Sequence, residues 1–324
     1  MSVLVTGGAG YIGSHMVLAL ADAGEAVTVL DNLSTGVRSA VDARATFVEG
    51  DVGDSDLVSK TLRENDVSAV IHFAGSIVVP ESVADPLKYY LNNTAKTRTL
   101  IEACVQEKVP HFVFSSTAAV YGTPEQVPVA EDAMLNPMSP YGRSKLMSEW
   151  MLQDVAAAHD LKYAVLRYFN VAGADPDGRS GQSTRDATHL IKVAVQTALG
   201  TRDHMSIYGD DYATPDGTCI RDYIHVSDLI AAHVAALGHL RGGGASLTAN
   251  CGYGHGASVR EVIDAVERVS GTKVDARMAG RRAGDPDAIV ADATRAREVL
   301  GWSPVHDDLD EIVRHALAWE RTLS

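Results

Sequence analysis

A tyrosine and a lysine four positions apart, Tyr141 and Lys145, are the residues of this sequence best suited to acid–base chemistry. Pro140 marks the expected start of a helix, and residues four apart on a helix share one face. A phenol with its ordinary pKa of about 10 is a poor base at neutral pH, but a nearby ammonium favours the phenolate. Tyr141 can then take a proton from an alcohol or sugar hydroxyl, with Thr117 hydrogen-bonded to the same oxygen. The alternative is an ordinary Tyr/Lys pair on a helix surface.

Three glycines near the start of the chain, Gly7, Gly10 and Gly13, follow a short β-branched run and precede an amphipathic segment. Gly7 suits a sharp turn, Gly10 leaves no Cβ between the backbone and a pyrophosphate, and Gly13 lets a helix press close to a strand. The N–H groups at the start of that helix, around Tyr11 and Ile12, favour phosphate oxygens. We therefore predict a dinucleotide site here; the alternative is a glycine-rich surface turn.

The acidic residue that follows, Asp31, indicates which dinucleotide binds. It ends a second apolar run, 18 residues after Gly13. A carboxylate at this point accepts both hydroxyls of the adenosine ribose and repels a 2′-phosphate, and no Arg or Lys follows before Arg38. The sequence thus favours NAD over NADP, and Lys145 would also hold the nicotinamide ribose. The alternative for Asp31 is a turn aspartate before Asn32.

The elements that must position these residues alternate between strand and helix patterns. We expect a first strand near residue 3, further strands at 26–30, 46–49, 69–73, 111–115 and 163–169, and helices at 11–23, 54–65, 86–107 and 141–159. Such alternation predicts an α/β fold with a Rossmann-type, doubly wound parallel sheet covered on both faces. Ligands bind beyond the carboxyl ends of such strands. The residues expected there are Gly7, Asp31, Asp51, Ala74, Ser115 and Asn170.

After residue 169 the pattern changes. Residues 170–184 are rich in Gly, Asp and Ser and are expected to form an ordered loop or lid. Later helices are expected at 187–199, from 227, at 258–269 and at 308–321, and strands at 205–208, 218–224, 247–251 and 273–278. We therefore divide the chain into an NAD-binding Rossmann domain, residues 1–169, and a smaller mixed α/β substrate domain, residues 170–324. Some segments of the second part are expected to return to the first.

The composition excludes several classes of partner. Hydrophobic residues make up 46% and charged residues 22% of the 324 residues, as in a soluble globular enzyme. A net charge of −14 without a basic cluster argues against nucleic acid and against an acidic membrane surface. No apolar run is long enough to span a bilayer, and the first strand begins too early for a signal peptide. With three widely spaced cysteines, Cys104, Cys219 and Cys251, we expect a cytoplasmic protein.

No metal site is expected, because the 12 histidines lack a paired ligand spacing. His72 ends an apolar strand and is expected to be a packed, hydrogen-bonded residue.

Several motifs carry a family resemblance. TGGAGYIGSH, SSTAAVYG and the Tyr141/Lys145 pair resemble the extended short-chain dehydrogenases/reductases. HFAG, SPYGRSK, LRYFNVAGA, DGTCIRDYIHV and RRAGDPD narrow this to the UDP-glucose 4-epimerases, also called UDP-galactose 4-epimerases, along nearly the whole chain. The resemblance implies NAD-dependent interconversion of UDP-glucose and UDP-galactose. The sugar is oxidised at C4 to a 4-keto intermediate, which rotates and is reduced from its other face.

The resemblance also implies site residues. Tyr141, Lys145 and Thr117 would be catalytic, with Tyr141 as the base. The cofactor would be bound by Gly7, Gly10, Tyr11, Ile12, Gly13, Asp31, Asn32, Asp51, Val52, Phe73, Ala74, Gly75, Asn93, Ser115, Tyr141, Lys145 and Tyr168. The UDP-sugar would be bound by Thr117, Tyr141, Asn170, His189, Tyr208, Arg221, Arg282, Asp285 and Ile289. Of these, Arg221 and Arg282 would neutralise the diphosphate, unless they pair with Asp222 and Asp285 as structural bridges.

Three positions depart from the family pattern. His189 stands where the family often has an Asn that touches the nucleotide, and Ile77 where some members have a lysine near the cofactor. Ile289 stands where the size of the residue controls which sugars enter. Activity on UDP-GlcNAc/UDP-GalNAc or on a UDP-pentose therefore stays open, as does a non-catalytic NAD-binding sensor. Ala118 and Ala119 replace the acidic pair of the related 4,6-dehydratases, which disfavours elimination of water.

A homodimer is also implied, formed through the helices at 86–107 and 141–159. Ala103, Val105, Leu146 and Met147 could pack that interface, although apolar helix faces also pack against their own sheet.

Overall fold

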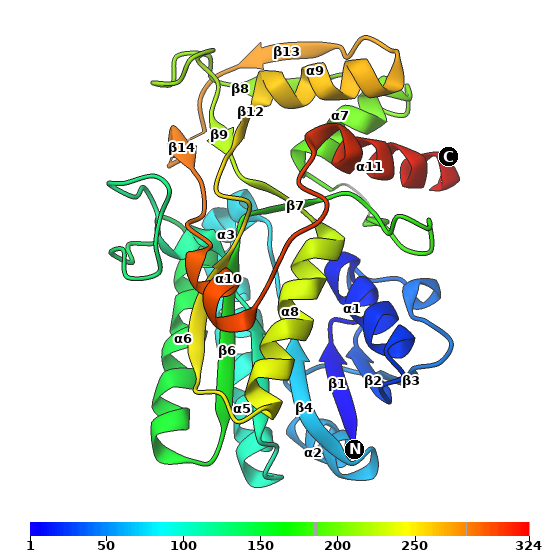
Figure 1. Ribbon diagram of the computed structural model, residues 1–324, viewed down its shortest axis with the longest axis vertical. Helices are drawn as coiled ribbons and strands as arrows, with labels where there is room; N and C mark the ends of the chain where they lie inside the picture. The colour runs from blue at the N-terminus through cyan, green and yellow to red at the C-terminus, as the bar shows by residue number, and fades with distance from the viewer. Residues whose placement is uncertain (185–186, 283, 324) are drawn as a thin grey trace.

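The computed structural model describes residues 1–184, 187–282 and 284–323. Its centre is a seven-stranded parallel sheet in the order β11-β6-β5-β4-β1-β2-β3 (Figure 1). The bounds of these strands are β1 Ser2–Thr6, β2 Val27–Asp31, β3 Thr46–Glu49, β4 Val67–His72, β5 His111–Ser115, β6 Lys162–Tyr168 and β11 Leu247–Cys251. The predicted fold class is confirmed: a doubly wound α/β sheet whose order changes direction between β1 and β4.

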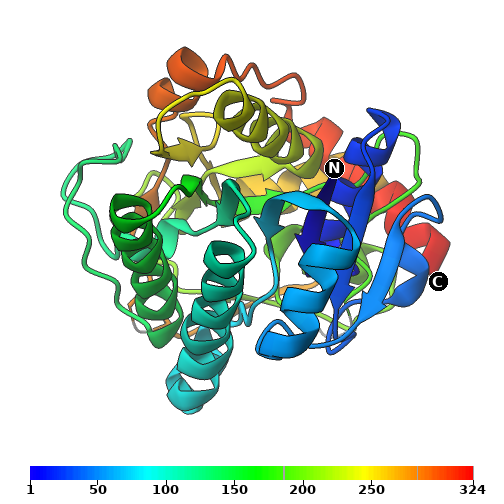
Figure 2. The same ribbon diagram turned by 90° about the horizontal axis from the view of Figure 1, so that it is seen from below.

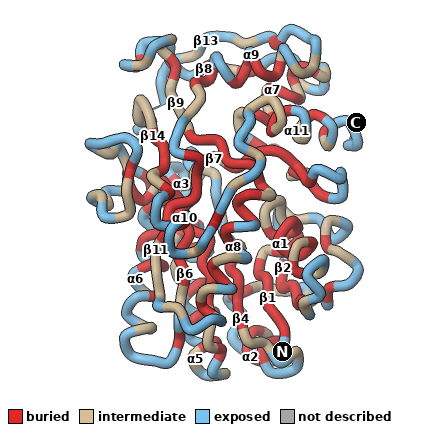
Figure 3. Tube along the Cα trace, in the orientation of Figure 1, coloured by how far each residue is buried: buried red, intermediate tan, exposed pale blue. Residues whose placement is uncertain are grey.

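Helices cover both faces of this sheet. On one side lie α2 (Ser55–Glu64), α5 (Lys96–Gln106) and α6 (Pro140–Ala158); on the other lie α1 (Tyr11–Asp22) and α8 (Val226–Arg241) (Figure 2). The strands are accordingly apolar on both faces: Val3 and Val5 join the core under α1 and α8, while Leu4 joins the core under α2, α5 and α6. In Figure 3, β1 and β4 are buried along most of their length.

The remaining elements form a smaller layer at the carboxyl ends of the large sheet. Three small sheets pair β7 (Asn170–Ala172) with β10 (Tyr223–His225), β8 (Met205–Tyr208) with β13 (Ala276–Ala279), and β12 (Ala257–Ser258) with β9 (Ile220–Arg221) and β14 (Ala288–Ile289). Around them pack α7 (Leu190–Ala198), α9 (Val259–Ser270) and α11 (Leu309–Leu323), whereas α10 (Thr294–Leu300) contacts α8 and β11 (Figure 1). Within the described residues, no helix is both long and apolar enough to cross a bilayer.

The structure differs from the expected elements in several places. The helix expected at 86–107 is divided into α4 (Pro86–Tyr89), a π-helical turn at Tyr90–Ala95 and α5, and the short helix α3 (Val79–Ala84) precedes it. The stretch 170–184 contains β7 and a bridge between Ala174 and Gly181, and α7 begins at Leu190 rather than at 187. The strand expected at 218–224 is broken at Asp222 into β9 and β10, and α10 was not expected.

Candidate active site

The glycine turn between β1 and α1 has the geometry of a phosphate-binding loop. Gly7 has φ +70°, and a Cβ there would lie 2.6 Å from the backbone nitrogen of Ala74. A Cβ on Gly13 would lie 2.1 Å from the carbonyl oxygen of Gly7, so the helix can approach the strand only because Gly13 has none. A Cβ on Gly10 would meet a single atom, Gly7 O at 3.2 Å, so Gly10 otherwise borders open space. The three glycines therefore play three different physical roles.

The first turn of α1 leaves its backbone donors available. Gly10 is the N-cap, no side chain caps the helix, and the first turn holds no acidic residue. The unpaired N–H groups and the positive end of the helix dipole thus face the space beside Gly10, which suits an anion. Tyr11 points elsewhere: its hydroxyl donates to Gly173 O at 2.7 Å and ties the loop to the segment after β7. Ile12 packs against the core.

Asp31, at the end of β2, is buried and holds two backbone groups. Its Oδ2 accepts from the N–H of Ala9 in the glycine turn at 2.9 Å, and its Oδ1 accepts from Leu33 at 2.8 Å. Each carboxylate oxygen can accept a second hydrogen bond, so the side chain can still receive ribose hydroxyls. The alternative interpretation as a turn aspartate describes part of its role, because the bond to Leu33 is a local turn contact.

Asp51 and Asn32 lie together beyond β2 and β3. Asn32 Nδ2 donates to Asp51 Oδ2 at 3.1 Å, and Lys96 Nζ lies 2.7 Å from the same oxygen. Burial alone would raise the pKa of Asp51, but the bonds from Lys96 and from the backbone of Gly53 outweigh it and lower that pKa. Val52 beside it is buried in the core under α2 and α5. Sequence reasoning missed Lys96, which no motif marks.

Gly75 and Asn93 connect the end of β4 to α6. Asn93, in the π-helical turn, accepts from Ser76 N at 2.8 Å and donates to Ser76 O at 2.9 Å and to Ser144 Oγ at 3.0 Å. A Cβ on Gly75 would lie 2.9 Å from Asn93 Oδ1 and 3.6 Å from Lys145 Nζ. Asn93 therefore fixes the turn after β4 against the helix that carries Tyr141 and Lys145. Phe73 and Ala74, just before this turn, are partly buried against the two cores.

Tyr141 lies in the first turn of α6. Ser139 caps that helix by accepting from Gly142 N at 3.2 Å, and Pro140 follows at the first helical position, which fixes where Tyr141 emerges. The tyrosine is 7% exposed, and its burial raises the pKa of the phenol, while a hydrogen bond with Thr117 lowers it. The lowering contact shown by the structure comes from Thr117, and burial outweighs it; the lowering expected from Lys145 stays a prediction.

Lys145 is buried one helical turn beyond Tyr141. Its Nζ donates to Ser115 O at 3.0 Å and lies 4.9 Å from the centre of the Phe114 ring. Burial lowers the pKa of Lys145 to about 8, against a raising contribution from Glu149. Ser115 Oγ in turn donates to Tyr168 Oη at 3.0 Å. Burial raises the pKa of Tyr168, and Tyr141 raises it further, so the two phenols are electrostatic neighbours.

A buried network of polar side chains lies next to Ser115 and Lys145 in the chain and in the fold. Glu149 pairs with Arg167 at 2.6 Å, both less than 4% exposed, and Ser116 donates to the same carboxylate. Arg167 also donates to Tyr121 Oη at 3.0 Å, and Tyr121 donates to Asn250 Oδ1 at 2.7 Å. The network thus joins β6, β11 and α6 to Ser116, the residue that follows Ser115 at the end of β5. Ser116, Tyr121 and Arg167 lie within motifs quoted above, but those motifs gave them no role, and Glu149 and Asn250 lie in none of the motifs.

His72 is, as expected, packed and hydrogen-bonded. It is fully buried between Thr6 Oγ1 at 2.6 Å and Thr97 Oγ1 at 2.9 Å, and burial lowers its pKa to about 3.

The residues predicted for the nucleotide part of a substrate gather in the smaller layer. Arg221 Nη1 donates to Ile220 O and Pro286 O at 2.8 and 2.9 Å, and its Nη2 lies 3.9 Å from Asp285 Oδ1. Arg221, Asp285 and Arg282 all act electrostatically on the Cys219 thiol, so the three charged side chains lie near it. The guanidinium of Arg282 lies 3.8 Å from the centre of the Tyr208 ring. Residue 283 of this segment is outside the described ranges.

The two structural ion pairs considered as alternatives do not form as expected. Asp222 accepts from the backbone N–H groups of Tyr253, Gly254 and Ala291 at 3.0 to 3.2 Å rather than pairing with Arg221. Its burial raises its pKa, although those bonds lower it. Arg282 packs on the ring of Tyr208, and Asp285 forms a long ion pair of 3.9 Å with Arg221 instead.

Ile289 joins the two groups of residues. In β14 it pairs with Arg221 of β9, and its side chain, 7% exposed, belongs to the same apolar cluster as Ala118 and Leu146. Ile289 therefore lies between Arg221 and the segment that carries Thr117. Ile77, by contrast, is 49% exposed.

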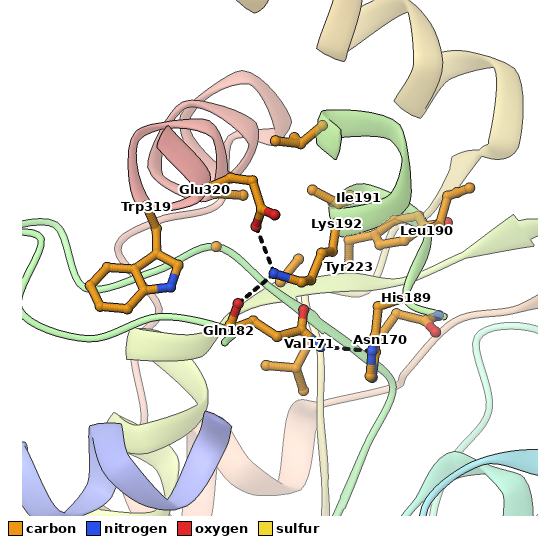
Figure 4. A pocket seen from close by; sticks show the side chains of 14 residues that line it. Asn170, Val171, Gln182, His189, Leu190, Ile191, Lys192, Tyr223, Trp319 and Glu320 are labelled. Atoms are coloured by element: carbon orange, nitrogen blue, oxygen red, sulfur yellow. Dashed lines mark hydrogen bonds and ion pairs between the residues drawn. The ribbon is translucent and has the colours of Figure 1, made fainter. Parts of the chain in front are cut away.

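A pocket between β7, β10, α7 and α11 contains two more predicted residues, Asn170 and His189 (Figure 4). Asn170 pairs in register with Tyr223 of β10, and His189 is the N-cap residue of α7. Sequence reasoning missed Gln182 and Lys192, which line the same pocket.

Three comparisons with known proteins agree. The model of the NAD dependent epimerase/dehydratase family matches residues 3–252. A protein of Azospirillum brasilense named UDP-glucose 4-epimerase is 62% identical over 99% of this chain and 92% of its own length. The crystal structure of UDP-glucose 4-epimerase from Brucella ovis in complex with NAD has a TM-score of 0.95 at 50% identity, over 98% of this chain and 97% of that one. The enzyme from Bifidobacterium longum, in complex with NAD+ and UDP, has a TM-score of 0.95 at 38% identity, over 99% and 98%.

Proposed function

The chain belongs to the NAD-dependent epimerase/dehydratase family, and on that premise we propose that it interconverts UDP-glucose and UDP-galactose by oxidation and re-reduction at C4 of the sugar. The observation that carries the proposal is the combination of a buried Tyr141, hydrogen-bonded to Thr117, with a full-length similarity to enzymes of that name.

The residues present fit NAD. The open space beside Gly10 and the free N–H groups of α1 suit a pyrophosphate, and Asp31 retains acceptor capacity for the adenosine ribose. Lys145, between the ends of β4 and β5, would hold the nicotinamide ribose. NAD, when bound, supplies the acceptor for a hydride from sugar C4 and the donor that gives it back.

The proton of the C4 hydroxyl is handled by the chain itself. Tyr141 takes it when the sugar is oxidised and returns it when the 4-keto sugar is reduced, so no net proton is consumed. Thr117 donates to the phenolate and so favours the basic form. Ala118 and Ala119 offer no second acid or base, and the hydroxyl removed by elimination in a dehydratase therefore stays on the sugar.

In this proposal the nucleotide anchors the substrate while the sugar turns over. Arg221, with Arg282 nearby, balances the diphosphate charge in an otherwise acidic protein, and Asp285 is available to the uridine ribose. Residues 1–169 carry the NAD site and residues from 170 on bind the nucleotide sugar, apart from β11 and α8, which lie in the large sheet layer. The chain acts in the reducing cytoplasm, a proposal supported by its three free thiols.

The test is turnover of UDP-galactose by purified protein loaded with NAD, with UDP-GlcNAc and UDP-xylose as parallel substrates. We expect UDP-glucose to form. We also expect kcat/KM for UDP-galactose to exceed kcat/KM for UDP-GlcNAc and for UDP-xylose. Formation of no UDP-glucose by fully loaded, folded protein would refute the proposal, and a higher kcat/KM on UDP-GlcNAc would reassign the sugar.

We further propose a homodimer, formed by a surface of adjacent helices. Large apolar side chains on α3, α4, the π-helical turn and α6 are 36–77% exposed: Val83, Leu87, Leu91, Met147 and Trp150. Such a concentration of exposed apolar groups is typical of an interface. Of the four residues expected there from the sequence, only Met147 is exposed; Ala103 and Leu146 are buried in the chain's own cores, and Val105 packs against one of them.

A charge on this surface tests the dimer. Leu87→Glu should convert the dimer to a monomer in light scattering, because burying a carboxylate in an apolar interface is costly. Val305→Glu, a change at an exposed valine before α11, is the matched control and should leave the mass unchanged. A monomeric wild type at micromolar concentration would reject the interface.

A further inference from the structure

Two histidines from distant parts of the chain share a hydrogen bond whose direction the structure fixes. His225, at the end of β10, is the N-cap residue of α8, and its Nδ1 accepts from the backbone N–H of Ser227 at 3.0 Å. The proton of neutral His225 is therefore on Nε2, which donates to Nδ1 of His315 on α11 at 3.0 Å. His315 in turn carries its own proton on Nε2. While this bond exists, both rings are neutral and each is held in one tautomer.

The surroundings of the two rings disfavour a positive charge. His225 is fully buried, and burial lowers its pKa to about 3, with further lowering by His306 and His315. The ring of His306, in the segment before α11, lies over His225 with the centroids 4.5 Å apart. Burial also lowers the pKa of His315, although Glu311 raises it.

Charged groups on five neighbouring elements face this pair of histidines. They are Glu311 and Arg314 on α11, His306 before α11, His15 on α1, Asp175 after β7 and Asp228 on α8. Each of the three carboxylates bonds another side chain. Glu311 accepts from His306, Asp175 from Arg179, and Asp228 from Tyr253. The bond between His225 and His315 is therefore a contact between two neutral rings.

His225 also packs on the segment that follows β7. A Cβ on Gly173 would lie 2.7 Å from Nε2 of His225, so the ring rests directly on this glycine. The carbonyl oxygen of Gly173 accepts from Tyr11 in the first turn of α1, and Ser180 is hydrogen-bonded to Ser14 of the same helix at 2.9 Å. Residues 173–182 thus connect His225 to the start of α1, where the N–H groups face the pyrophosphate site.

The far end of α11 covers the same segment. A Cβ on Gly181 would lie 2.2 Å from the indole of Trp319. Lys192 donates to Gln182 O and to Glu320, both at 2.6 Å, and so joins the segment to α11 through α7 (Figure 4). Helix α11 therefore holds residues 173–182 in place, and the bond from His315 to His225 attaches the helix beside Gly173.

We propose that the His225–His315 bond is an acid-sensitive latch, which holds α11 over residues 173–182 at neutral pH and opens when either ring takes up a proton. A proton on His315 adds an Nδ1–H that meets the Nε2–H of His225, so two donors face each other. His225 cannot change tautomer to relieve this conflict, because its Nδ1 caps α8. A proton on His225 itself removes that cap.

The size of the effect follows from the titration of histidine. The closed latch takes up no proton, whereas a released histidine titrates with the ordinary pKa of about 6.5. The latch is therefore fully stabilising above that pH, and the stabilisation is lost as the pH falls through it. Between pH 7.5 and 5.5, each histidine released shifts the opening equilibrium about tenfold toward the open state.

Hydrogen–deuterium exchange of the NAD-loaded protein at pH 7.5 and 5.5 measures this opening. The protection factor of α11 is taken against the intrinsic exchange rate at each pH, so the pH dependence of exchange itself cancels. In His315→Asn, the amide oxygen replaces Nδ1 and can accept from His225 but does not titrate. His159→Asn, at an exposed histidine that ends α6, is the matched control. The protection factor of α5 reports global unfolding.

We expect the protection factor of α11 to fall about tenfold more in the wild type and in His159→Asn than in His315→Asn. The wild type should also lose more bound NAD on gel filtration at pH 5.5 than His315→Asn does. Equal protection of wild-type α11 at both pH values would overturn the proposal without any variant. The same fall in His315→Asn, or a fall shared by α5, would overturn it too, and equal NAD loss would refute the connection to α1.

Discussion

Replacing Thr117 by valine should move the pH dependence of turnover, because this residue tunes the base. Thr117 is 8% exposed, and its hydroxyl lowers the pKa of Tyr141, which burial raises. A hydrogen bond to the charged form stabilises that form, so removing the bond raises the pKa further. The same oxygen accepts from Ala119 N at 3.1 Å, so the variant also loses a local cap.

The size of the effect follows from the strength of the bond. A hydrogen bond to a charged group contributes about 1.5 kcal/mol or more, and 1.36 kcal/mol corresponds to roughly one pKa unit. Below the pKa of Tyr141, the phenolate fraction, and with it the rate, should therefore fall about tenfold. The lost cap should lower the free energy of unfolding by about 1 kcal/mol, too little to unfold the protein.

The assay is kcat/KM for UDP-galactose from pH 6 to pH 10 for the wild type, Thr117→Val and Thr117→Ser. We expect the valine profile to shift by about one unit toward alkaline pH. The serine variant, which keeps the hydroxyl, should follow the wild type. Because burial holds the pKa of Tyr141 above that of a free phenol, the shift appears over this range as valine rates about tenfold below those of the wild type, and valine rates equal to the wild type's would refute the tuning role.

Three further changes test the site and its support. Tyr141→Phe should lower turnover by roughly 10²–10⁴-fold while the NAD content of the purified protein stays unchanged, and near wild-type rates would reassign the base. Gly10→Ala should change the free energy of unfolding by no more than about 1 kcal/mol but abolish NAD retention. Gly13→Ala, whose Cβ would lie 2.1 Å from a backbone oxygen, should lower the free energy of unfolding by about 3 kcal/mol or more in a denaturant titration. Equal behaviour of the two variants would contradict the roles assigned to these glycines. Glu149→Gln leaves the buried Arg167 without its countercharge and should lower the free energy of unfolding by about 3–5 kcal/mol, so a urea midpoint like the wild type's would show the pair to be dispensable.

The fold and the cofactor side were predictable from the sequence because their signals are local. The turn needs Gly7 and Gly13 to lack a Cβ atom, as the contacts that those atoms would make show, and Gly10 between them borders open space. Strand ends are also local, since polar residues such as Asp31 and Ser115 follow apolar runs. In a parallel sheet all such ends meet at one edge, so several distant positions come together without further information.

The rest depends on contacts between distant residues. Asn93 can bridge Ser76 and Ser144 only because a π-helical turn points it there, and no periodicity marks that turn. The Glu149–Arg167 pair joins α6 to β6, and the Gln182–His189 bond joins a loop to α7. The rise that burial gives to the Tyr141 pKa is likewise a property of the folded chain, which the spacing of Tyr141 and Lys145 does not reveal.

Strand β11 has a consequence for how the molecule is assembled. It is the outermost strand next to β6, yet Leu247 is made long after Tyr168, once β7, α7 and β8 of the smaller layer have been made. Until then β6 presents an unpaired edge, and the Arg167–Tyr121–Asn250 chain lacks its last member. A nascent chain halted before residue 247 should thus be a target for chaperones and proteases rather than an independent nucleotide carrier.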